Sequence, residues 1–259
     1  MSIHPTALVS PKAELATNSQ IGPYAIVEDG VSVAADCRVG AHAVLKRGLR
    51  LGSGVIVHEG AVLGGAPQDI KFRGGDTGCE IGRGTVVREF ATVHRSTRAG
   101  DPTQIGKDCY LMGYAHIGHD CIVADNSTIA SYTALAGHVR VGEGAFVSGG
   151  VVVHQYTRIG ELSFIGGGSK VNMDVPPFVT VDGVPARAVG LNVVGLKRAG
   201  LTVETRRALR RAFRLLFRSP SPRSLAVASL AESDIDEVRA LADFFSTSER
   251  GVCRARSAR

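Results

Sequence analysis

The chain has 259 residues, of which 44% are apolar and 21% are charged, and its formal net charge is +6. This length supports one large hydrophobic core or two small ones, and the apolar fraction excludes an intrinsically disordered chain. No apolar run approaches the roughly 18 residues that a membrane-spanning helix needs, and residues 1–5 do not begin a secretory signal. We therefore expect a cytoplasmic protein without an integral membrane segment.

The basic excess is confined to the C-terminal part of the chain. Residues 188–259 hold 14 Lys and Arg against 7 Asp and Glu, whereas residues 1–187 hold 16 against 17. A basic segment of this kind suits an anionic partner such as nucleic acid, a nucleotide or an acidic protein. A solvated helix face rich in Arg is the simpler alternative, and composition alone does not decide between them.

Aliphatic residues recur at every sixth position from Ile3 to Val171. Of the 29 positions in this series, 26 are Ile, Leu or Val, and a small residue usually follows four positions later. A six-residue unit with one large and one small inward side chain is the sequence signature of a parallel β-helix. The sequence therefore predicts a mainly β fold: a β-helix of about ten triangular coils, each built from three such units.

The series is interrupted at residues 66–80 and 96–104, two polar, Gly-rich stretches that preserve the six-residue phase. We expect them to form loops that project from the coil wall, where binding residues are common, although a tolerated insertion is also possible. Cysteines also follow the pattern, because four of the five occupy the small inward position: Cys37, Cys79, Cys109 and Cys121. We therefore expect packed, reduced thiols.

After Val171 the six-residue pattern stops at Asp174-Val175-Pro176-Pro177. From Thr202 the apolar residues follow a helical period, with Thr202 as the N-cap and Ser219-Pro220 as the end of the helix. A second helix is expected from Ser233 to about Phe245. We accordingly divide the chain into a β-helix domain, residues 1–187, and a C-terminal helical subdomain, residues 188–259.

Histidines gather in the second half of the β-helix. Because residues 18 apart stack in adjacent coils, His119, Gly137 and Gln155 form one column. Asp120, His138 and Tyr156 form the next column. A His beside an Asp can act as a general base, and a glycine leaves its N–H free to meet a developing oxyanion. No Ser or Cys nucleophile accompanies His119, so direct attack by a substrate hydroxyl is expected.

Other interpretations of these histidines stay open. His116, His119, His138 and His154 could hold zinc, because related β-helices carry three-His hydratase centres. They could also be structural side chains at the corners of the coils. A third alternative is a non-catalytic β-helix that binds partners through its flat faces.

Several segments carry a resemblance to a known family. They are Gln68-Asp69-Ile70-Lys71, His94-Arg95, residues 115–121 (AHIGHDC), residues 135–139 (LAGHV), Val153-His154-Gln155, residues 174–177 (DVPP), Gly190-Leu191-Asn192 and residues 195–198 (GLKR). Together they resemble the acyl-[acyl-carrier-protein]–UDP-N-acetylglucosamine O-acyltransferases, which catalyse the first step of lipid A synthesis. The resemblance covers essentially the whole chain.

This resemblance implies a left-handed β-helix and a homotrimer with its sites between subunits. It implies that His119 is the general base on the glucosamine 3-hydroxyl of UDP-N-acetylglucosamine, that Asp120 supports it and that Gly137 supplies the oxyanion N–H. The hydroxyl would attack the thioester of a 3-hydroxyacyl chain on the phosphopantetheine arm of acyl carrier protein. No metal and no further cofactor are expected.

The same resemblance implies several binding residues. Those that would contact the sugar, the pyrophosphate or the pantetheine are Asp69, Lys71, His94, His116, His138, His154 and Gln155, with Asn192 and Arg198 from the neighbouring subunit. Gly167 occupies the position that sets acyl-chain length, and a glycine there predicts a long chain. The basic tail would face the acidic carrier protein, so no nucleic acid partner is expected.

Val194 and Ala199 depart from the family pattern, which has an acidic residue and an Arg at these positions. Both positions lie toward the nucleotide, so acylation of a 3-amino analogue of the sugar is an alternative. An acetyl-CoA-dependent sugar-nucleotide acetyltransferase on the same scaffold is another.

Overall fold

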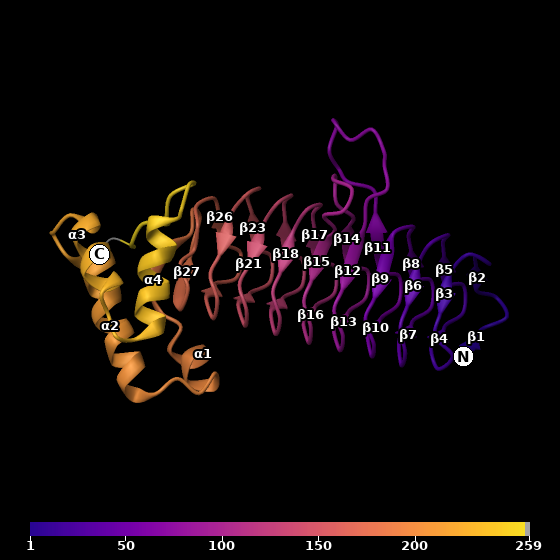
Figure 1. Cartoon of the computed structure of the whole chain (residues 1–259), viewed down its shortest axis with the longest axis horizontal. Helices are drawn as coiled ribbons and strands as arrows, with labels where there is room; N and C mark the ends of the chain where they lie inside the picture. Colours follow the sequence, from indigo (N-terminus) through magenta and orange to yellow (C-terminus); the bar gives the residue numbers. More distant parts are fainter. Residues whose placement is uncertain (257–259) are drawn as a thin grey trace.

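A parallel β-helix and a group of C-terminal helices make up the chain in the computed structural model, which describes residues 1–256 (Figure 1). Each coil contributes one short strand to each of three sheets, which we call sheets A, B and C. All strand pairs are parallel except β27 with β28, which form a terminal hairpin. The predicted mainly β fold, a β-helix with C-terminal helices, is confirmed.

The strands are two to five residues long because each six-residue unit also contains a turn. Sheet A contains β1 (Ser2–Ile3), β4 (Gln20–Ile21), β7 (Arg38–Val39), β10 (Ile56–Val57), β13 (Val86–Val87), β16 (Tyr110–Leu111), β19 (Thr128–Ile129), β22 (Phe146–Val147), β25 (Phe164–Ile165), β27 (Val179–Asp182) and β28 (Arg187–Leu191). Sheet B contains β2 (Leu8–Val9), β5 (Ile26–Val27), β8 (Val44–Leu45), β11 (Val62–Gly65), β14 (Thr92–His94), β17 (His116–Ile117), β20 (Ala134–Leu135), β23 (Val152–Val153) and β26 (Lys170–Val171). Sheet C contains β3 (Glu14–Leu15), β6 (Ser32–Val33), β9 (Leu49–Leu51), β12 (Cys79–Ile81), β15 (Thr103–Ile105), β18 (Ile122–Val123), β21 (Arg140–Val141) and β24 (Arg158–Ile159).

The register of the coils follows the predicted stacking. β17 pairs with β20 so that His116 lies opposite Ala134, 18 positions further along the chain. Thr92 of β14 instead lies opposite His116, because the chain makes a detour between β14 and β15. A longer detour separates β11 from β12, and both loops project from the same edge of the β-helix (Figure 1). The two interruptions of the sequence pattern are therefore loops, as predicted.

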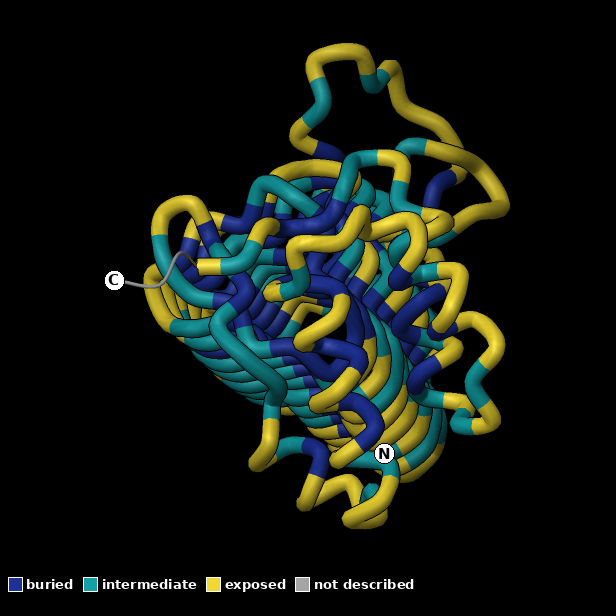
Figure 2. Tube along the Cα trace, turned by 90° about the vertical axis from the view of Figure 1, so that its left-hand side faces the viewer, coloured by how far each residue is buried: buried dark blue, intermediate teal, exposed yellow. Residues whose placement is uncertain are grey.

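The core of the β-helix is the column of inward side chains. Large aliphatic residues such as Leu45, Ile117 and Leu135 are fully buried, and the view along the coils shows buried residues lining the interior (Figure 2). All five cysteines are buried free thiols, which confirms their predicted packing. Burial raises the pKa of the Cys79 and Cys121 thiols to about 12, so both are neutral.

The C-terminal helices are α1 (Val193–Arg198), α2 (Val203–Arg218), α3 (Arg223–Ala231) and α4 (Asp236–Ser246). The predicted ends of α2 are confirmed, because Thr202 Oγ1 accepts a hydrogen bond from Thr205 N and Ser219 follows the last turn. The prediction missed α1 and α3. α3 has only two buried residues, so its sequence carries little helical periodicity. None of the helices in residues 1–256 is both long and apolar enough to cross a membrane.

The helices continue directly from the end of the β-helix. The hairpin strand β28 runs across the predicted domain boundary at 187/188, and the C-terminal segment returns to it where Ala255 bridges to Ala188. Residues 257–259 of the predicted helical subdomain lie outside the described residues. The division of the chain into two domains stays a prediction.

Truncating an inward aliphatic side chain is expected to weaken the whole β-helix. Leu45→Ala removes a fully buried side chain and leaves a cavity, which costs about 2–5 kcal/mol of unfolding free energy. Leu8→Ala, on an outward position of the same sheet that is 67% exposed, should change it by less than about 0.5 kcal/mol. Urea denaturation of both variants measures the difference, and equal losses would contradict the assignment of inward and outward positions.

Candidate active site

The candidate site lies at one corner of the β-helix, where the chain turns from sheet B to sheet C. His119 and Asp120 follow β17, and His138 follows β20 one coil later. Asp120 and His138 occupy the left-handed position of their turns, with φ of 59° and 62°. Because the coils are in register, turn residues of successive coils lie directly above one another.

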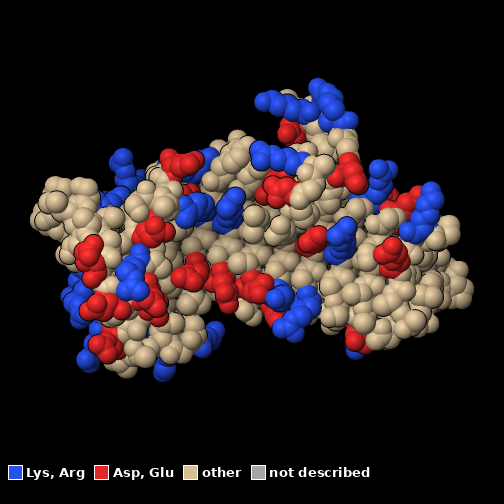
Figure 3. Space-filling view, in the orientation of Figure 1, with Lys and Arg blue, Asp and Glu red and all other residues tan. Residues whose placement is uncertain are grey.

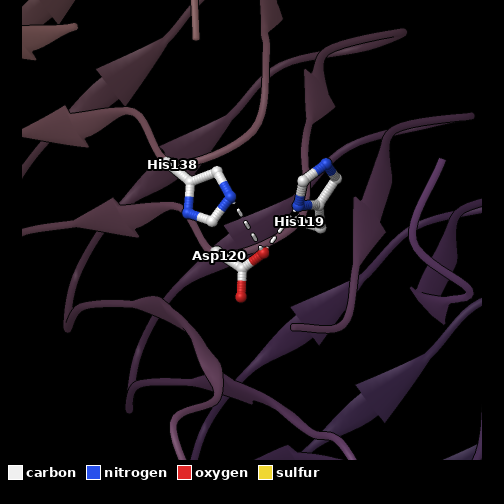
Figure 4. Close-up of side chains that lie close together, drawn as sticks. All are labelled: His119, Asp120 and His138. Carbon is white, nitrogen blue, oxygen red and sulfur yellow. Dashed lines mark hydrogen bonds and ion pairs between the residues drawn. The ribbon is translucent and has the colours of Figure 1, made fainter. Parts of the chain in front are cut away.

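His119, Asp120 and His138 form a connected cluster (Figure 4). His119 Nδ1 lies 2.6 Å from Asp120 Oδ2, and His138 Nε2 lies 3.5 Å from the same oxygen. The two imidazole rings meet edge to face with their centres 5.2 Å apart. The carboxylate is 7% exposed and the His119 side chain 14%, so the pair is shielded but open to a ligand.

The loop between β14 and β15 holds Asp120 in place. Thr97 donates from its backbone N–H to Asp120 Oδ1 and from its hydroxyl to Oδ2, both at 2.9 Å. Burial alone would raise the pKa of this carboxyl, but the hydrogen bonds from His119 and Thr97 outweigh it and bring the pKa below its ordinary value. Asp120 is therefore a carboxylate near neutral pH. It accepts the Nδ1 proton of His119, so the lone pair of the imidazole is on Nε2.

Gly137 lies directly beneath the imidazole of His119. A Cβ at this position would lie 2.5 Å from His119 Cε1 and 2.6 Å from Nε2, so only glycine leaves room for the ring. Within residues 1–256 the Gly137 N–H donates to no protein acceptor. This contact agrees with the predicted column of His119 and Gly137, whereas the use of Gly137 as an oxyanion donor stays a prediction.

Two further histidines adjoin the cluster on sheet B. His116 Nδ1 lies 2.8 Å from Thr92 Oγ1, and the His94 and His116 rings meet edge to face at 4.8 Å. Burial, with the neighbouring His116 and His119, lowers the pKa of His94 to about 4, and burial also lowers the pKa of His116. Both rings are therefore neutral at pH 7. His94 Nδ1 is buried without a hydrogen-bond partner in the described chain, which leaves a polar atom available to a ligand.

The two projecting loops carry charged groups to the same corner. Burial lowers the pKa of His138, and the charge of Arg98 adds to this effect. The carboxylates of Asp120 and Asp69 oppose it, so Asp69 is close enough to influence the imidazole. Lys71 is exposed on the same loop as Asp69. The backbone N–H of Lys71 donates to Asp69 Oδ1 at 2.9 Å.

Most of the predicted site residues occupy this corner. Those around or beside the cluster are Asp69, Lys71, His94, His116, His119, Asp120, Gly137, His138, His154 and Gln155. His154 and Gln155 follow β23 and are exposed, and the Gln155 carbonyl accepts a hydrogen bond from Arg250 at 2.7 Å.

Three predicted residues lie elsewhere in the chain. Gly167 follows β25, at the corner between sheets A and B, and is exposed. Asn192 caps α1, with Oδ1 accepting from Gly195 N at 3.0 Å and Nδ2 donating to the Leu162 carbonyl at 2.8 Å. Arg198 is exposed at the end of α1, which lies beyond the last coils (Figure 1). A single chain does not bring these residues to His119.

The prediction missed the two threonines that orient the cluster. Thr97 and Thr103 both bond to Asp120, the latter accepting the Asp120 N–H at 2.8 Å. Tyr156 stacks on His138 with ring centres 4.4 Å apart. The 18-residue register pointed to Tyr156, but only the folded loop shows that Thr97 reaches Asp120.

One atom each from His119, Asp120 and His138 could surround a metal ion, and the atoms that already face one another are His119 Nδ1, Asp120 Oδ2 and His138 Nε2. Two of them are already joined by the 2.6 Å hydrogen bond, and Oδ2 also accepts from Thr97. A metal ion would therefore have to break the hydrogen bond that leaves the lone pair on Nε2. The geometry favours a base over a metal ligand set.

Known proteins share both parts of this architecture. Residues 102–137 match the family model for bacterial transferase hexapeptide repeats, and residues 174–253 match the model for domain 2 of UDP-N-acetylglucosamine O-acyltransferase. The acyl-[acyl-carrier-protein]–UDP-N-acetylglucosamine O-acyltransferase of Thiobacillus denitrificans is 45% identical over 98% of this chain and 99% of its own. The enzyme of that name from Halorhodospira halophila is 43% identical over 97% and 99%. The crystal structure of UDP-N-acetylglucosamine O-acyltransferase from Moraxella catarrhalis has a TM-score of 0.93 at 36% identity and covers 98% of this chain and 100% of its own.

The low pKa of His94 predicts a dependence of stability on pH. His94 has a pKa of about 4 in the folded chain and about 6.5 when unfolded, so the unfolded state binds the proton first as the pH falls. The folded state therefore loses stability between about pH 6.5 and pH 4. After allowance for solvent screening, the loss is on the order of 1–2 kcal/mol. Urea denaturation at pH 7 and pH 4.5 measures the free energy of unfolding at each pH. Between these two values His94→Asn should lose less of it than the unmodified chain.

The exposed His42 provides the matched control, because His42→Asn changes the same functional group outside the buried cluster. Between pH 7 and pH 4.5, His42→Asn should lose as much unfolding free energy as the unmodified chain. If His94→Asn loses as much unfolding free energy over this pH range as the control does, His94 is not the group that titrates.

Proposed function

The chain belongs to the acyl-[acyl-carrier-protein]–UDP-N-acetylglucosamine O-acyltransferase family, and on that premise we propose that it acylates the glucosamine 3-hydroxyl of UDP-N-acetylglucosamine. The acyl donor is a 3-hydroxyacyl chain on acyl carrier protein, and the reaction is the first step of lipid A synthesis. The observation that carries the proposal is the His119–Asp120 pair. His119 Nδ1 lies 2.6 Å from Asp120 Oδ2, which leaves the lone pair on Nε2, and the imidazole lies against Gly137.

The reaction proceeds by direct attack. His119 Nε2 takes the proton of the sugar 3-hydroxyl as its oxygen attacks the thioester carbonyl, and the Asp120 carboxylate stabilises the imidazolium that forms. The Gly137 N–H, free of protein acceptors in the described chain, donates to the oxyanion. When the tetrahedral intermediate collapses, the C–S bond breaks and His119 returns the proton to the sulfur of the departing pantetheine.

The surroundings of His119 support attack by the substrate rather than by the protein. Cys121 is the nearest thiol in the chain sequence, but burial raises its pKa to about 12 and its Sγ donates to the Ala136 carbonyl. A neutral, inward-facing thiol is a poor nucleophile. No metal ion and no cofactor other than the carrier protein's own phosphopantetheine arm are needed for these steps.

The sugar nucleotide contacts the neutral imidazoles and the loop around Asp69. The unpartnered His94 Nδ1 supports this placement, because a buried polar atom without a partner is normally satisfied by a ligand or water. The acidic carrier protein docks against the helices. Five exposed arginines on α2 favour this surface: Arg207, Arg210, Arg211, Arg214 and Arg218.

The functional assembly is a homotrimer in the cytoplasm, with each site shared between two subunits. The position of Gly167, Asn192 and Arg198 supports this arrangement, since all three lie away from the corner that carries His119 of the same chain. A neighbouring subunit would supply these residues to the site. Asn192 would do so while its side chain caps α1.

The His119→Asn variant tests the assignment of the base. Transfer from a ladder of 3-hydroxyacyl carrier proteins to UDP-N-acetylglucosamine should fall by about 10²–10⁴ in kcat, because a general base contributes that much. His42→Asn, at an exposed histidine outside the site, should retain the full rate. Circular dichroism on both variants verifies that the β-helix is intact.

Other outcomes of this assay would change the proposal. An unchanged rate in His119→Asn would contradict the base assignment, and loss of transfer after treatment with EDTA would favour the zinc interpretation. Transfer from acetyl-CoA alone would indicate the acetyltransferase, and acceptance of only the 3-amino sugar would change the acceptor. The absence of acyl transfer with every donor and acceptor would favour a non-catalytic β-helix that binds partners.

Gly167→Met tests the acyl-length position. A Cβ at Gly167 meets only the Gly149 carbonyl at 3.5 Å, so the fold should tolerate the side chain. The added bulk should shift the donor preference toward shorter chains by about tenfold or more in the ratio of kcat/KM values. Gly190→Met, where a Cβ meets no atom within 4 Å, is the control. An unchanged chain-length profile in Gly167→Met would contradict the role.

A further inference from the structure

A polar pocket of about 490 Å³ opens beside the catalytic cluster, on the outer face of sheet C. It reaches from Asp120 and His138 across β21 and β24 to the segment that follows α4. Its lining includes an unusual number of guanidinium groups: Arg98, Arg140, Arg158 and Arg250. None of these four was identified from the sequence as a site residue.

Arg140 and Arg158 lie directly opposite each other on neighbouring strands. Adjacent strands are about 4.8 Å apart, and like charges in such a pair destabilise a sheet. In the space-filling view, basic side chains lie over this part of the face (Figure 3). A pair of this kind is stabilised when an anion binds between the two guanidinium groups.

The protein holds two of the four arginines with neutral acceptors. Arg158 Nη1 donates to the Thr247 carbonyl at 3.0 Å, and its guanidinium lies 4.5 Å from the centre of the Phe244 ring. Arg250 Nη2 donates to the Gln155 carbonyl at 2.7 Å. These contacts position the side chains without neutralising their charge.

Arg98 and Arg140 are freer still. Across the described chain their side chains make no hydrogen bond, and none of the four arginines forms an ion pair. The two least exposed carboxylates of the pocket already accept hydrogen bonds. Asp120 accepts them from His119 and Thr97. Asp174 accepts them from the backbone N–H of Arg158 and the hydroxyl of Ser248. The other two, Asp101 and Glu249, are exposed at the rim.

We propose that this pocket binds a phosphate group of a substrate, with Arg140 at its centre, Arg158 beside it and Arg98 closing over it from the loop. The inference rests on the proposed function, because both proposed substrates carry phosphate. One is the phosphodiester of the carrier protein's pantetheine arm, and the other is the pyrophosphate of the sugar nucleotide. Arginine suits either group, since its planar donors match phosphate oxygens.

Binding measurements test the pocket without relying on activity. Isothermal titration calorimetry of the full chain with 4′-phosphopantetheine and, separately, with UDP should show binding of at least one probe. Arg140→Gln should weaken that binding by about tenfold, the effect of losing one charge-assisted contact. Arg38→Gln removes an exposed arginine from the corresponding outward strand position on sheet A and should leave binding unchanged.

The two probes distinguish the source of the phosphate. If Arg140→Gln binds only 4′-phosphopantetheine more weakly than the unmodified chain does, the pocket belongs to the carrier protein's arm. If it binds only UDP more weakly, the pocket belongs to the sugar nucleotide. Steady-state kinetics of Arg140→Gln should then show a raised KM for the corresponding substrate with kcat within about twofold of the unmodified enzyme. Arg98→Gln should show the same pattern.

The proposal is overturned if neither probe binds the unmodified chain, if Arg140→Gln binds both as well as the unmodified chain does, or if Arg38→Gln loses as much. An enzyme that fails to transfer acyl groups but binds a probe through Arg140 would contradict the proposed function and leave the pocket standing. Acyl transfer by the unmodified enzyme together with unchanged probe binding in Arg140→Gln would contradict the pocket and leave the proposed function standing.

Discussion

The vertical packing of one coil on the next is the constraint on which the rest of this protein depends. From Ile21 to Val171, each inward aliphatic side chain is buried against those of the coils above and below, and this contact sets the register of all three sheets. A slip by one residue would turn the aliphatic side chains outward, so the register is strongly fixed. Every turn residue is thereby placed above its counterpart in the previous coil.

The chemistry uses that fixed placement at the corners. Asp120 and His138 share the left-handed position of their turns, and stacking brings their side chains within 3.5 Å. Gly137 is required because the His119 ring lies where a Cβ would be. The loop that carries Thr97 adds the donors that keep Asp120 ionised. A rigid scaffold and one loop together hold the His119 imidazole with its lone pair on Nε2, the tautomer that the proposed base requires.

The triangular cross-section explains how the chain distributes its functions. One corner carries His119, another carries Gly167, and the face of sheet C next to His119 carries Arg140 and Arg158. Because the three corners point in different directions, His119 and Gly167 of one chain face different ways. Buried neutral histidines lie on the sheet B side of the base and guanidinium groups on the sheet C side. Two chemically different surfaces therefore meet at His119.

The sequence by itself determined the β-helix, its register and the neighbours of His119, because a six-residue period translates directly into position along and around the coil. It also located the two loops and the limits of α2, where Thr202 and Ser219 have strong local preferences. It could not show that Thr97 reaches Asp120, because a loop's path depends on contacts that have no period. Nor could it show α3, whose few buried residues carry little periodicity, or the pocket of Arg98, Arg140, Arg158 and Arg250. Those four arginines come from a loop, two strands and the C-terminal segment, and only the tertiary structure brings them together.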